Sequence, residues 1–434
     1  MKIRRLSIKN IRAFESLEWR PPDPNKNWNV ILGDNGSGKS TLLRSLSLVL
    51  VGPRQALATR QEWSTWLRRG TKAAEIAVDI LPDSDFDKFS KKGKVGNYRA
   101  LPASITIAVG SDGSVTPPEK TPGLKPLSPD RHVWGDGDGW FSAAYGPFRR
   151  FSGGDKDADR IFLSNPILGA HISVFGENVA LSECLLWLQE LNYKTLEKDE
   201  ESAELLERLK AFINQPDFLP NGVCLTKITS KAVEFEDSNG CPIAVEDLSD
   251  GFRSILSMTF ELIRQLDQYA APKDVFSEDM TRIILPGVVL IDEVDAHLHP
   301  NWQKEIGFWL TKHFPRIQFV VTTHSPLVCH AAKNGSIFHL PMPGADKMPR
   351  FIEGAELDRL LYGDILDGIS TSAFGVESTR SKEANSLQAR LADLNLAELI
   401  RDLTQAESAE QQQLRTIFAT DAGLVPKRND DSNS

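Results

Sequence analysis

The fold of this 434-residue chain is decided by residues 27–51, which read NWNVILGDNGSGKSTLLRSLSLVLV. An apolar strand over 27–32 leads directly into the pattern Gly33-x-x-x-x-Gly38-Lys39-Ser40, and residues 41–51 continue as a helix with an apolar inward side. Glycines let such a loop curl until several backbone N–H groups point at one anion, and the helix that follows adds its positive N-terminal end. The flanking strand and helix therefore favour a phosphate-binding loop over a glycine turn without function.

The residue types in this loop predict how a nucleotide is held. The Lys39 ammonium reaches the β- and γ-phosphates, and the Ser40 hydroxyl is an oxygen ligand of the kind that Mg²⁺ prefers. ATP and Mg²⁺ are thus the expected ligands. The residues of the loop that we assign to ATP binding are Asn35, Gly36, Gly38, Lys39, Ser40 and Thr41.

A second apolar strand, predicted over 283–291, ends in Asp292-Glu293. In open α/β sheets ligands bind at the carboxyl ends of the strands, so both carboxylates are placed for chemistry. Asp292 is expected to hold Mg²⁺, and Glu293 to polarise the attacking water as a general base. A solvated acidic turn is the alternative, but a phosphate-binding loop in the same chain favours catalysis.

Three further segments extend this pattern. The stretch LSDGFRS over 248–254 precedes a predicted helix, which Ser249 can cap, and Ser249 and Gly251 form a second candidate anion site. His324 ends the strand IQFVVTTH, next to the strand that bears the carboxylates, where it can contact the γ-phosphate. His297 and His299 also suggest a metal pair, but this spacing is weak without a third ligand, so we favour a structural or interface role.

Composition narrows the class of protein. The chain is 41% hydrophobic, carries a net charge of −9 at pH 7, and contains four cysteines without a Cys-x-x-Cys pair. Reduced thiols are therefore expected rather than a disulfide framework. The net negative charge does not indicate binding to nucleic acid. We find no secretory signal and no run of apolar residues long enough for a membrane span, which predicts a cytoplasmic protein without a membrane partner.

The strands and helices predict an α/β fold, in which a parallel-sheet core joins an antiparallel N-terminal sheet. Continuous apolar strands at 283–291 and 317–322 indicate a parallel sheet covered by helices on both faces. Leu387, Leu391, Leu394, Ile400 and Leu403 form one predicted apolar stripe in a helical tail, for which packing within its own domain is favoured over partner binding. The predicted divisions are an N-terminal lobe over 1–177, a helical insertion over 178–222, a C-terminal lobe over 223–345, and a helical tail with a disordered end over 346–434.

Taken together, the motifs resemble the RecF/SMC/OLD-like branch of ABC-type ATPases. The carrying residues are IKNIRAFESLEW near the N-terminus, the phosphate-binding loop, LSDGF, LIDEVDAHLHPNWQ and VVTTHSP, and they cover 1–52 and 246–330. Within that branch the chain looks most like the PtuA-type ATPase subunits of bacterial anti-phage systems, Septu and its retron-associated relatives. The segment LLYGDILDGISTSAFGVESTRS contributes to this likeness.

The resemblance implies an ATPase that works as a homodimer or higher homo-oligomer. Lys39, Ser40, Asp292, Glu293 and His324 then act within one subunit, with Lys39, Glu293 and His324 as the catalytic set. Ser249 and Gly251 serve the ATP of the opposite subunit, and Arg12 matches the N-terminal arginine that approaches the nucleotide.

In such a system the chain senses or regulates, and a separate effector, a nuclease, causes the damage, since we find no nuclease motif here. A RecF-like repair ATPase with nucleic acid as its partner, a transporter ATPase, and a scaffold locked by ATP are the alternatives. The glutamine of the Q-loop is not evident, and the arginines of Tyr145–Arg150, at its place, are left between nucleotide, partner and packing roles.

Overall fold

The computed structural model of the protein describes residues 1–89, 100–123, 129–135, 139–149, 165–176, 183–216, 218–219, 222–229, 232–374 and 381–418. The expectations for Arg150, for a helix beginning at 178 and for the chain end fall outside these residues. The chain divides into two compact units, residues 1–374 and 375–434. The finer division into four parts remains a prediction.

The core of the first unit is a six-stranded sheet in the order β14-β13-β3-β12-β11-β7. Its strands are β3 (Trp28–Leu32), β7 (Ser142–Tyr145), β11 (Gly287–Ile291), β12 (Ile317–Thr323), β13 (Gly335–His339) and β14 (Arg350–Phe351). Every pair is parallel except β13 with β14. All residues of β3, β11 and β12 are buried, which confirms the predicted parallel sheet. The strand predicted over 283–291 is shorter than expected, because the part that pairs in the sheet begins only after Pro286, which lacks the N–H that a ladder needs.

Two antiparallel sheets accompany this core. The N-terminal sheet has the order β2-β1-β4-β5-β6, which confirms the antiparallel sheet expected there. Its strands are β1 (Lys2–Ile11), β2 (Phe14–Trp19), β4 (Ala73–Leu81), β5 (Leu101–Ala108) and β6 (Glu119–Lys120). The smaller sheet has the order β10-β9-β8, with β8 (Cys224–Ile228), β9 (Val233–Glu236) and β10 (Pro242–Ala244).

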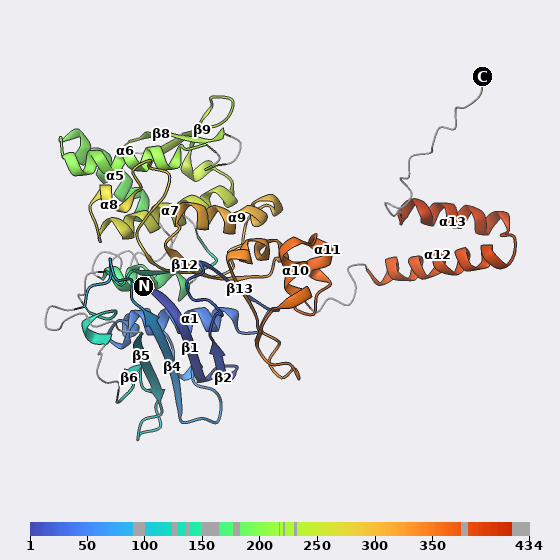
Figure 1. Ribbon diagram of the computed structural model, residues 1–434, viewed down its shortest axis with the longest axis horizontal. Coiled ribbons are helices and arrows are strands. Elements are labelled where there is room, and N and C mark those ends of the chain that lie inside the picture. Colours follow the sequence, from blue (N-terminus) through green and yellow to red (C-terminus); the bar gives the residue numbers. More distant parts are fainter. Residues whose placement is uncertain are drawn as a thin grey trace. The chain divides into compact units, whose positions relative to one another are not determined.

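Helices of the first unit lie on both sides of the parallel sheet, and some of them pack on other helices or on the antiparallel sheets. They are α1 (Lys39–Val51), α2 (Pro53–Ala56), α4 (Pro166–Gly169), α5 (Glu183–Leu196), α6 (Glu200–Ile213), α7 (Asp250–Asp267), α8 (Pro272–Val275), α9 (Pro300–His313), α10 (Gly354–Tyr362) and α11 (Ile365–Ile369). Figure 1 shows α1 between the N-terminal sheet and the parallel sheet, with α7 and α9 on the opposite face. Leu290 faces the core around α1, whereas its neighbours Val289 and Ile291 face the core that contains α7 and α9. This alternation buries both faces of the sheet.

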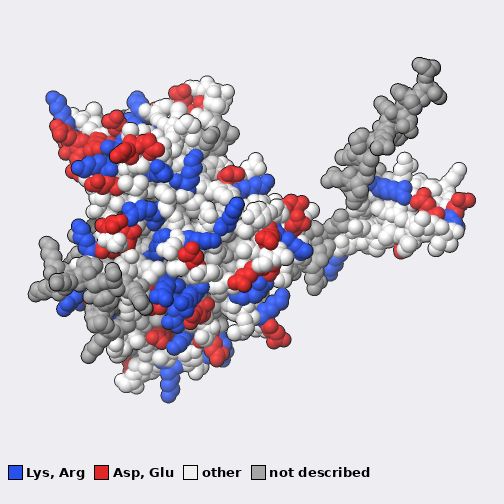
Figure 2. Space-filling model, in the orientation of Figure 1, with Lys and Arg blue, Asp and Glu red and all other residues white. Residues whose placement is uncertain are grey.

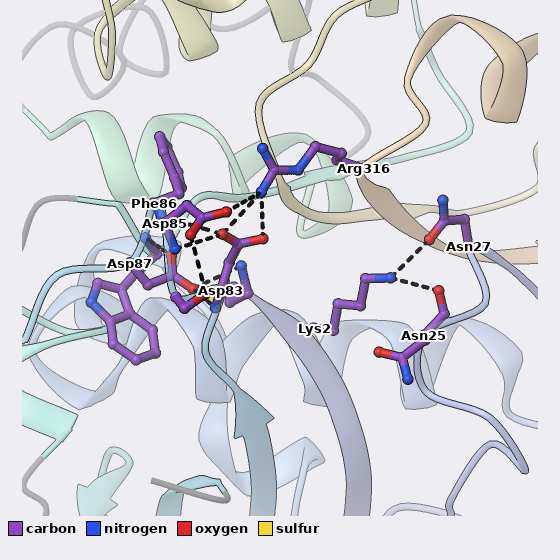
Figure 3. A network of polar contacts seen from close by, with 11 residues as sticks. Lys2, Asn25, Asn27, Asp83, Asp85, Phe86, Asp87 and Arg316 are labelled. Atoms are coloured by element: carbon purple, nitrogen blue, oxygen red, sulfur yellow. Dashed lines mark hydrogen bonds and ion pairs between the residues drawn. The ribbon is translucent and has the colours of Figure 1, made fainter. Parts of the chain in front are cut away.

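Polar contacts fix the N-terminal sheet to the starts of two core strands (Figure 3). The Arg316 guanidinium, just before β12, donates two hydrogen bonds to the Asp83 carboxylate at 3.0 and 2.9 Å. The Lys2 ammonium donates to the side-chain oxygen of Asn27, just before β3, at 3.1 Å. The antiparallel layer is thereby held in register with the strands that carry the candidate site.

The second unit contains a helical hairpin of α12 (Lys382–Ile400) and α13 (Gln405–Ile417). Its small core consists of Leu391, Leu394 and Leu414. The predicted stripe is wrong at Leu387 and at Ile400, which are 36% and 84% exposed. At about 100° per residue, Ile400 has rotated well away from the side of α12 on which Leu394 lies.

Acidic side chains are concentrated on one part of the surface. Figure 2 shows them, in red, clustered over the region of α5 and α6. A groove of about 500 Å³ there is lined by Trp187, Glu190, Leu191, Lys194, Glu197, Asp199, Glu201, Ser202, Leu205 and Asp267.

Among the described residues no helix is long and apolar enough to cross a bilayer. Of the four cysteines, Cys184 and Cys329 are buried, Cys224 is half-buried and Cys241 is exposed.

Candidate functional site

The strand order brings three predicted motifs to one edge of the parallel sheet. The glycine-rich loop follows β3, His324 follows β12, and Asp292 and Glu293 follow β11. Because β3, β12 and β11 are consecutive and parallel, their carboxyl ends lie side by side. The predicted pairing of the His324 strand with the strand before Asp292 is confirmed. Residues distant in sequence therefore share one site.

The glycine-rich loop is built around positive backbone angles. Gly36 has a φ of 81° and Gly38 a φ of 100°, conformations that side chains with a Cβ rarely adopt. The Lys39 ammonium is buried and donates hydrogen bonds to the carbonyl oxygens of Gly33 at 2.7 Å and Asp34 at 3.0 Å. The lysine is thus folded against its own loop, at the place where a phosphate would meet it.

Close packing requires glycine at two positions of the loop, and one buried hydroxyl of the loop is unpaired. A Cβ on Gly38 would lie 2.5 Å from the Phe14 ring, and one on Gly33 would collide with the Leu340 carbonyl oxygen. The Ser37 hydroxyl is buried and, within the described part of the chain, has no hydrogen-bond partner. An unsatisfied buried hydroxyl beside a glycine cradle indicates a ligand that accepts hydrogen bonds, such as a phosphate.

The two carboxylates are positioned by Thr322 of β12. Its hydroxyl donates to Oδ1 of Asp292 at 2.5 Å and accepts from the backbone N–H of Glu293 at 2.7 Å. Asp292 is buried and Glu293 is half-buried, with a φ of 48°. Thr322 was not among the residues predicted from the sequence. The available signal was a pair of hydroxyl side chains, Thr322-Thr323, at the end of an otherwise apolar buried strand.

Charges at this edge of the sheet influence one another. Burial lowers the pKa of Lys39, while the negative charges of Asp292 and Glu293 act in the opposite direction. Burial also lowers the pKa of His324, and the Lys39 charge lowers it further. His324 is therefore neutral at pH 7, with an imidazole that can exchange hydrogen bonds without adding charge.

The segment with Ser249 and Gly251 lies at the start of α7. Ser249 occupies the N-cap position, where the sequence allowed it to cap the helix, but its side chain makes no capping hydrogen bond. A cavity of about 740 Å³ lies here, and no residue of the glycine-rich loop lines it. Its lining residues are Ser249, Asp250, Gly251, Phe252, Ile255, His297, Leu298, His299, Asn301 and Trp302.

The remaining residues predicted to bind ATP are Arg12 and three residues in or next to the glycine-rich loop. The Arg12 side chain donates to the Thr65 carbonyl oxygen at 3.3 Å, and its guanidinium carbon lies 4.7 Å from the centre of the Trp66 ring. Burial, and then the charge of Arg44, lower the pKa of Arg12. Asn35 is exposed on the loop, while Ser40 and Thr41 are half-buried in the first turn of α1. No described contact joins Arg12 to the loop, so its approach to a nucleotide stays a prediction.

Two other findings concern residues outside the predicted set. No group of three or more His, Cys, Asp or Glu suited to a metal ion occurs in the described ranges, so there His297 and His299 have no third ligand of these types. Arg149, whose role was left open, is buried against the turn that carries the carboxylates. In the sequence, only its place in the segment where the resemblance expects the Q-loop pointed to it.

Comparison with known proteins shows that this chain matches one protein family. The family described as "AAA domain, putative AbiEii toxin, Type IV TA system" matches residues 28–329, a range that includes the glycine-rich loop, both carboxylates and His324.

Similar curated proteins carry related names. The "Retron Ec83 probable ATPase" of Escherichia coli is 26% identical over 82% of this chain and 74% of that protein. The Septu protein PtuA of Bacillus mycoides (strain KBAB4) is 25% identical over 77% of this chain but only 39% of its own length. The "Retron Vc95 probable ATPase" of Vibrio cholerae serotype O1 biovar El Tor is 23% identical over 76% of this chain and 71% of that protein. These relatives confirm the predicted resemblance to Septu and retron ATPases.

Among solved structures, an SMC head bound to the C-terminal winged-helix domain of ScpA aligns with a TM-score of 0.45 and 17% identity, over 81% of this chain and 97% of that one. A structure of the recombination mediator protein RecF aligns with a TM-score of 0.41 and 13% identity, over 81% of this chain and 98% of that one.

Proposed function

This chain belongs to the AAA-domain family that matches residues 28–329, and from that premise we propose that it is a Mg²⁺-dependent ATPase that regulates a bacterial anti-phage defence complex. The observation that carries the hydrolytic part is the meeting of Lys39, Asp292, Glu293 and His324 at one edge of the parallel sheet. A cation, two carboxylates and a neutral imidazole beside a glycine cradle are the groups that phosphoryl transfer to water requires.

The proposed reaction assigns one task to each group. The backbone N–H groups of the loop and the Lys39 ammonium bind the β- and γ-phosphates of ATP. Mg²⁺, when bound, would be held by the Ser40 hydroxyl and Asp292 and would supply positive charge to the phosphates. Glu293 orients and polarises the water for in-line attack on the γ-phosphate, and His324 positions it from the neighbouring strand end.

We place Ser249 and Gly251 on the ATP of a second subunit. Ser249 is exposed, its hydroxyl is free of a capping bond, and the cavity beside it contains no residue of the chain's own glycine-rich loop. A helix N-terminus with a free hydroxyl suits a γ-phosphate that arrives from outside the subunit. Two-fold pairing then makes two equivalent ATP sites, because such interfaces are self-complementary.

The defence role rests on the relatives. The retron and Septu proteins share most of this chain's length with it, and we infer a similar cytoplasmic setting in which a separate effector, a nuclease, responds to ATP binding or turnover here. The acidic groove on α5 and α6 would repel a phosphate backbone at that face. A RecF-like ATPase that itself binds DNA is therefore the second candidate, and it predicts ATP-dependent DNA binding by the purified chain.

Mixing two inactive variants tests the clamp. Lys39→Ala removes the phosphate-binding cation, and Ser249→Arg blocks the opposing segment, so each variant alone is expected to lose turnover. In a mixed dimer one site carries both defects and the other carries none. Random mixing therefore restores up to about a quarter of wild-type turnover, from half the dimers with one of two sites intact. No recovery would mean that Lys39 and Ser249 of one and the same subunit serve one ATP, contrary to the clamp.

Glu293→Gln tests hydrolysis and the regulatory role separately. Losing a general base is expected to lower turnover about 10²- to 10⁴-fold while ATP still binds and dimers accumulate in mass photometry. Glu305→Gln, an exposed change on α9, is the matched control and should leave turnover unaltered. In cells that carry the chain with its neighbouring genes, Glu293→Gln should alter protection against phage in plaque assays. Unchanged protection would contradict a regulatory role for hydrolysis.

A further inference from the structure

The buried side chain of Arg149 connects the turn that bears the carboxylates to helix α7. It is 6% exposed, although arginine is rarely buried. Its Nη1 donates to the Asp292 carbonyl oxygen at 2.9 Å, and its Nη2 donates to the carbonyl oxygens of Glu293 at 3.1 Å and Val294 at 3.4 Å. On its other side, Nε donates to the Ser254 hydroxyl at 2.9 Å. One guanidinium therefore spans three consecutive carbonyls and a helix.

Arginine suits this position for reasons of shape and charge. Its planar fork presents several donors in fixed directions, whereas lysine offers one compact ammonium. The turn contains Glu293 in the left-handed region, so its carbonyls point in directions that regular structure cannot satisfy. Burial lowers the pKa of Arg149 to about 10, against the opposing charges of Asp295, Asp292 and Glu293, so it remains a cation at pH 7.

A direct role for Arg149 on ATP is disfavoured by these contacts. All three guanidinium nitrogens already donate to described partners, with Nη1 also bonded to the Gly146 carbonyl oxygen at 3.0 Å. An arginine that contacts a γ-phosphate would need at least one nitrogen directed at open space. The side chain instead holds protein to protein.

A second contact joins the same two elements. A Cβ on Gly251, in the first turn of α7, would lie 3.1 Å from the His297 carbonyl oxygen, closer than ordinary van der Waals contact. The turn after β11 therefore touches α7 at two places, near Gly251 and through Arg149 at Ser254. Packed elements linked at two points move together rather than independently.

We propose that Arg149 is a positioning residue that couples the carboxylate turn of one ATP site to the α7 segment serving the other site. The proposal rests on the proposed clamp, in which Glu293 acts on the subunit's own ATP and Ser249 on its partner's. When ATP binding shifts Asp292 and Glu293, the backbone carbonyls of these residues move the Arg149 guanidinium. The hydrogen bond from Arg149 to Ser254 then passes this movement to α7. Each subunit thus transmits the state of one ATP to the other.

Ser254→Ala cuts this link on the α7 side alone, because the bonds from Arg149 to the turn remain. Ser257→Ala is the matched control: it lies one turn further along α7 and is buried, but its hydroxyl bonds only within the helix, to the Ser254 carbonyl oxygen. Losing a charge-assisted hydrogen bond is expected to lower kcat about tenfold for Ser254→Ala, with the ATP dissociation constant unchanged within about twofold. Ser257→Ala should match the wild type in both.

Hydrogen exchange separates this proposal from the clamp itself. In the Glu293→Gln background, ATP should protect the amides of 250–267 from exchange, and Ser254→Ala should weaken that protection, with only the Gly251 contact left, while Ser257→Ala keeps it. This readout applies to monomers and dimers alike, and mass photometry of the same samples reports the clamp. Equal protection in the two serine variants would overturn the coupling, whether or not dimers form. Monomers with intact, Ser254-dependent protection would overturn the clamp alone.

Discussion

Thr322 and Asp292 share a 2.5 Å hydrogen bond that crosses from β12 to the end of β11. The same Thr322 oxygen accepts the N–H of Glu293 at 2.7 Å, so one hydroxyl orients both the carboxylate assigned to Mg²⁺ and the turn that bears the general base. His324 directly follows β12. The strand between the phosphate-binding loop and the carboxylates therefore organises both.

Replacing Thr322 by valine should uncouple these groups. The shape is retained, but the buried Glu293 N–H and Asp292 lose a partner, which is expected to cost about 1–3 kcal/mol of unfolding free energy and about tenfold in kcat. Urea unfolding and steady-state ATP turnover measure both effects. Thr322→Ser keeps the hydroxyl and should retain most of the turnover. If the valine variant were as active as the serine variant, the hydroxyl would have no part in positioning.

Ser249→Ala should separate stability from activity. Loss of a capping serine commonly costs about 1 kcal/mol, but Ser249 makes no capping bond, so its unfolding free energy should change by less than about 0.5 kcal/mol. ATP turnover should nevertheless fall, because the free hydroxyl is assigned to the opposing γ-phosphate. Asp199→Ala provides the reverse control, since that side chain caps α6 through Ser202. A stability loss in Ser249→Ala without a change in turnover would support a mere cap.

How far the sequence could predict this site depends on the range of each interaction. The glycine-rich loop and Asp292-Glu293 are contiguous patterns whose chemistry follows from the residue types, and strand periodicity placed them at the same edge of a sheet. Thr322 was missed and the role of Arg149 was left open, because both roles depend on contacts with residues 30 and 143 positions away. Neither propensity nor spacing encodes such partners when only one sequence is considered.

One alternative that the sequence left open and one error have a similar origin. Ser249 stands where a capping serine is common, and only the structure shows that its hydroxyl does not bond to the helix. Ile400 shares the apolar character of Leu391 and Leu394, but only those two are covered by α13. Apolar spacing predicts which residues can be buried, while the tertiary partner decides which of them are.

The exposed end of the α12–α13 hairpin should tolerate polar substitutions. Leu399 and Ile400 are 83% and 84% exposed, so Leu399→Ser with Ile400→Ser should change the hairpin's thermal stability by less than about 0.5 kcal/mol. Leu394→Ala in its small core should instead cost about 2–3 kcal/mol. Circular dichroism of the full chain during thermal unfolding compares them. A double serine variant as unstable as Leu394→Ala would show that this face is covered in solution.

Acid should destabilise the fold through His171, whose ring bonds the hydroxyls of Ser47 on α1 and Ser142 on β7 at 2.8 and 2.9 Å. Burial lowers its pKa to about 3, so the folded protein keeps it neutral while the unfolded chain takes up a proton near pH 6.5. The stability that the neutral, buried His171 contributes to the fold is fully present above pH 6.5 and is lost as the pH falls from there towards 3. Between pH 7.5 and 4.5 the wild type should lose about 2–3 kcal/mol more unfolding free energy than His171→Gln. Ser47→Ala, which keeps the buried imidazole, should retain the wild-type slope, and parallel curves for wild type and His171→Gln would show that this histidine does not titrate with unfolding.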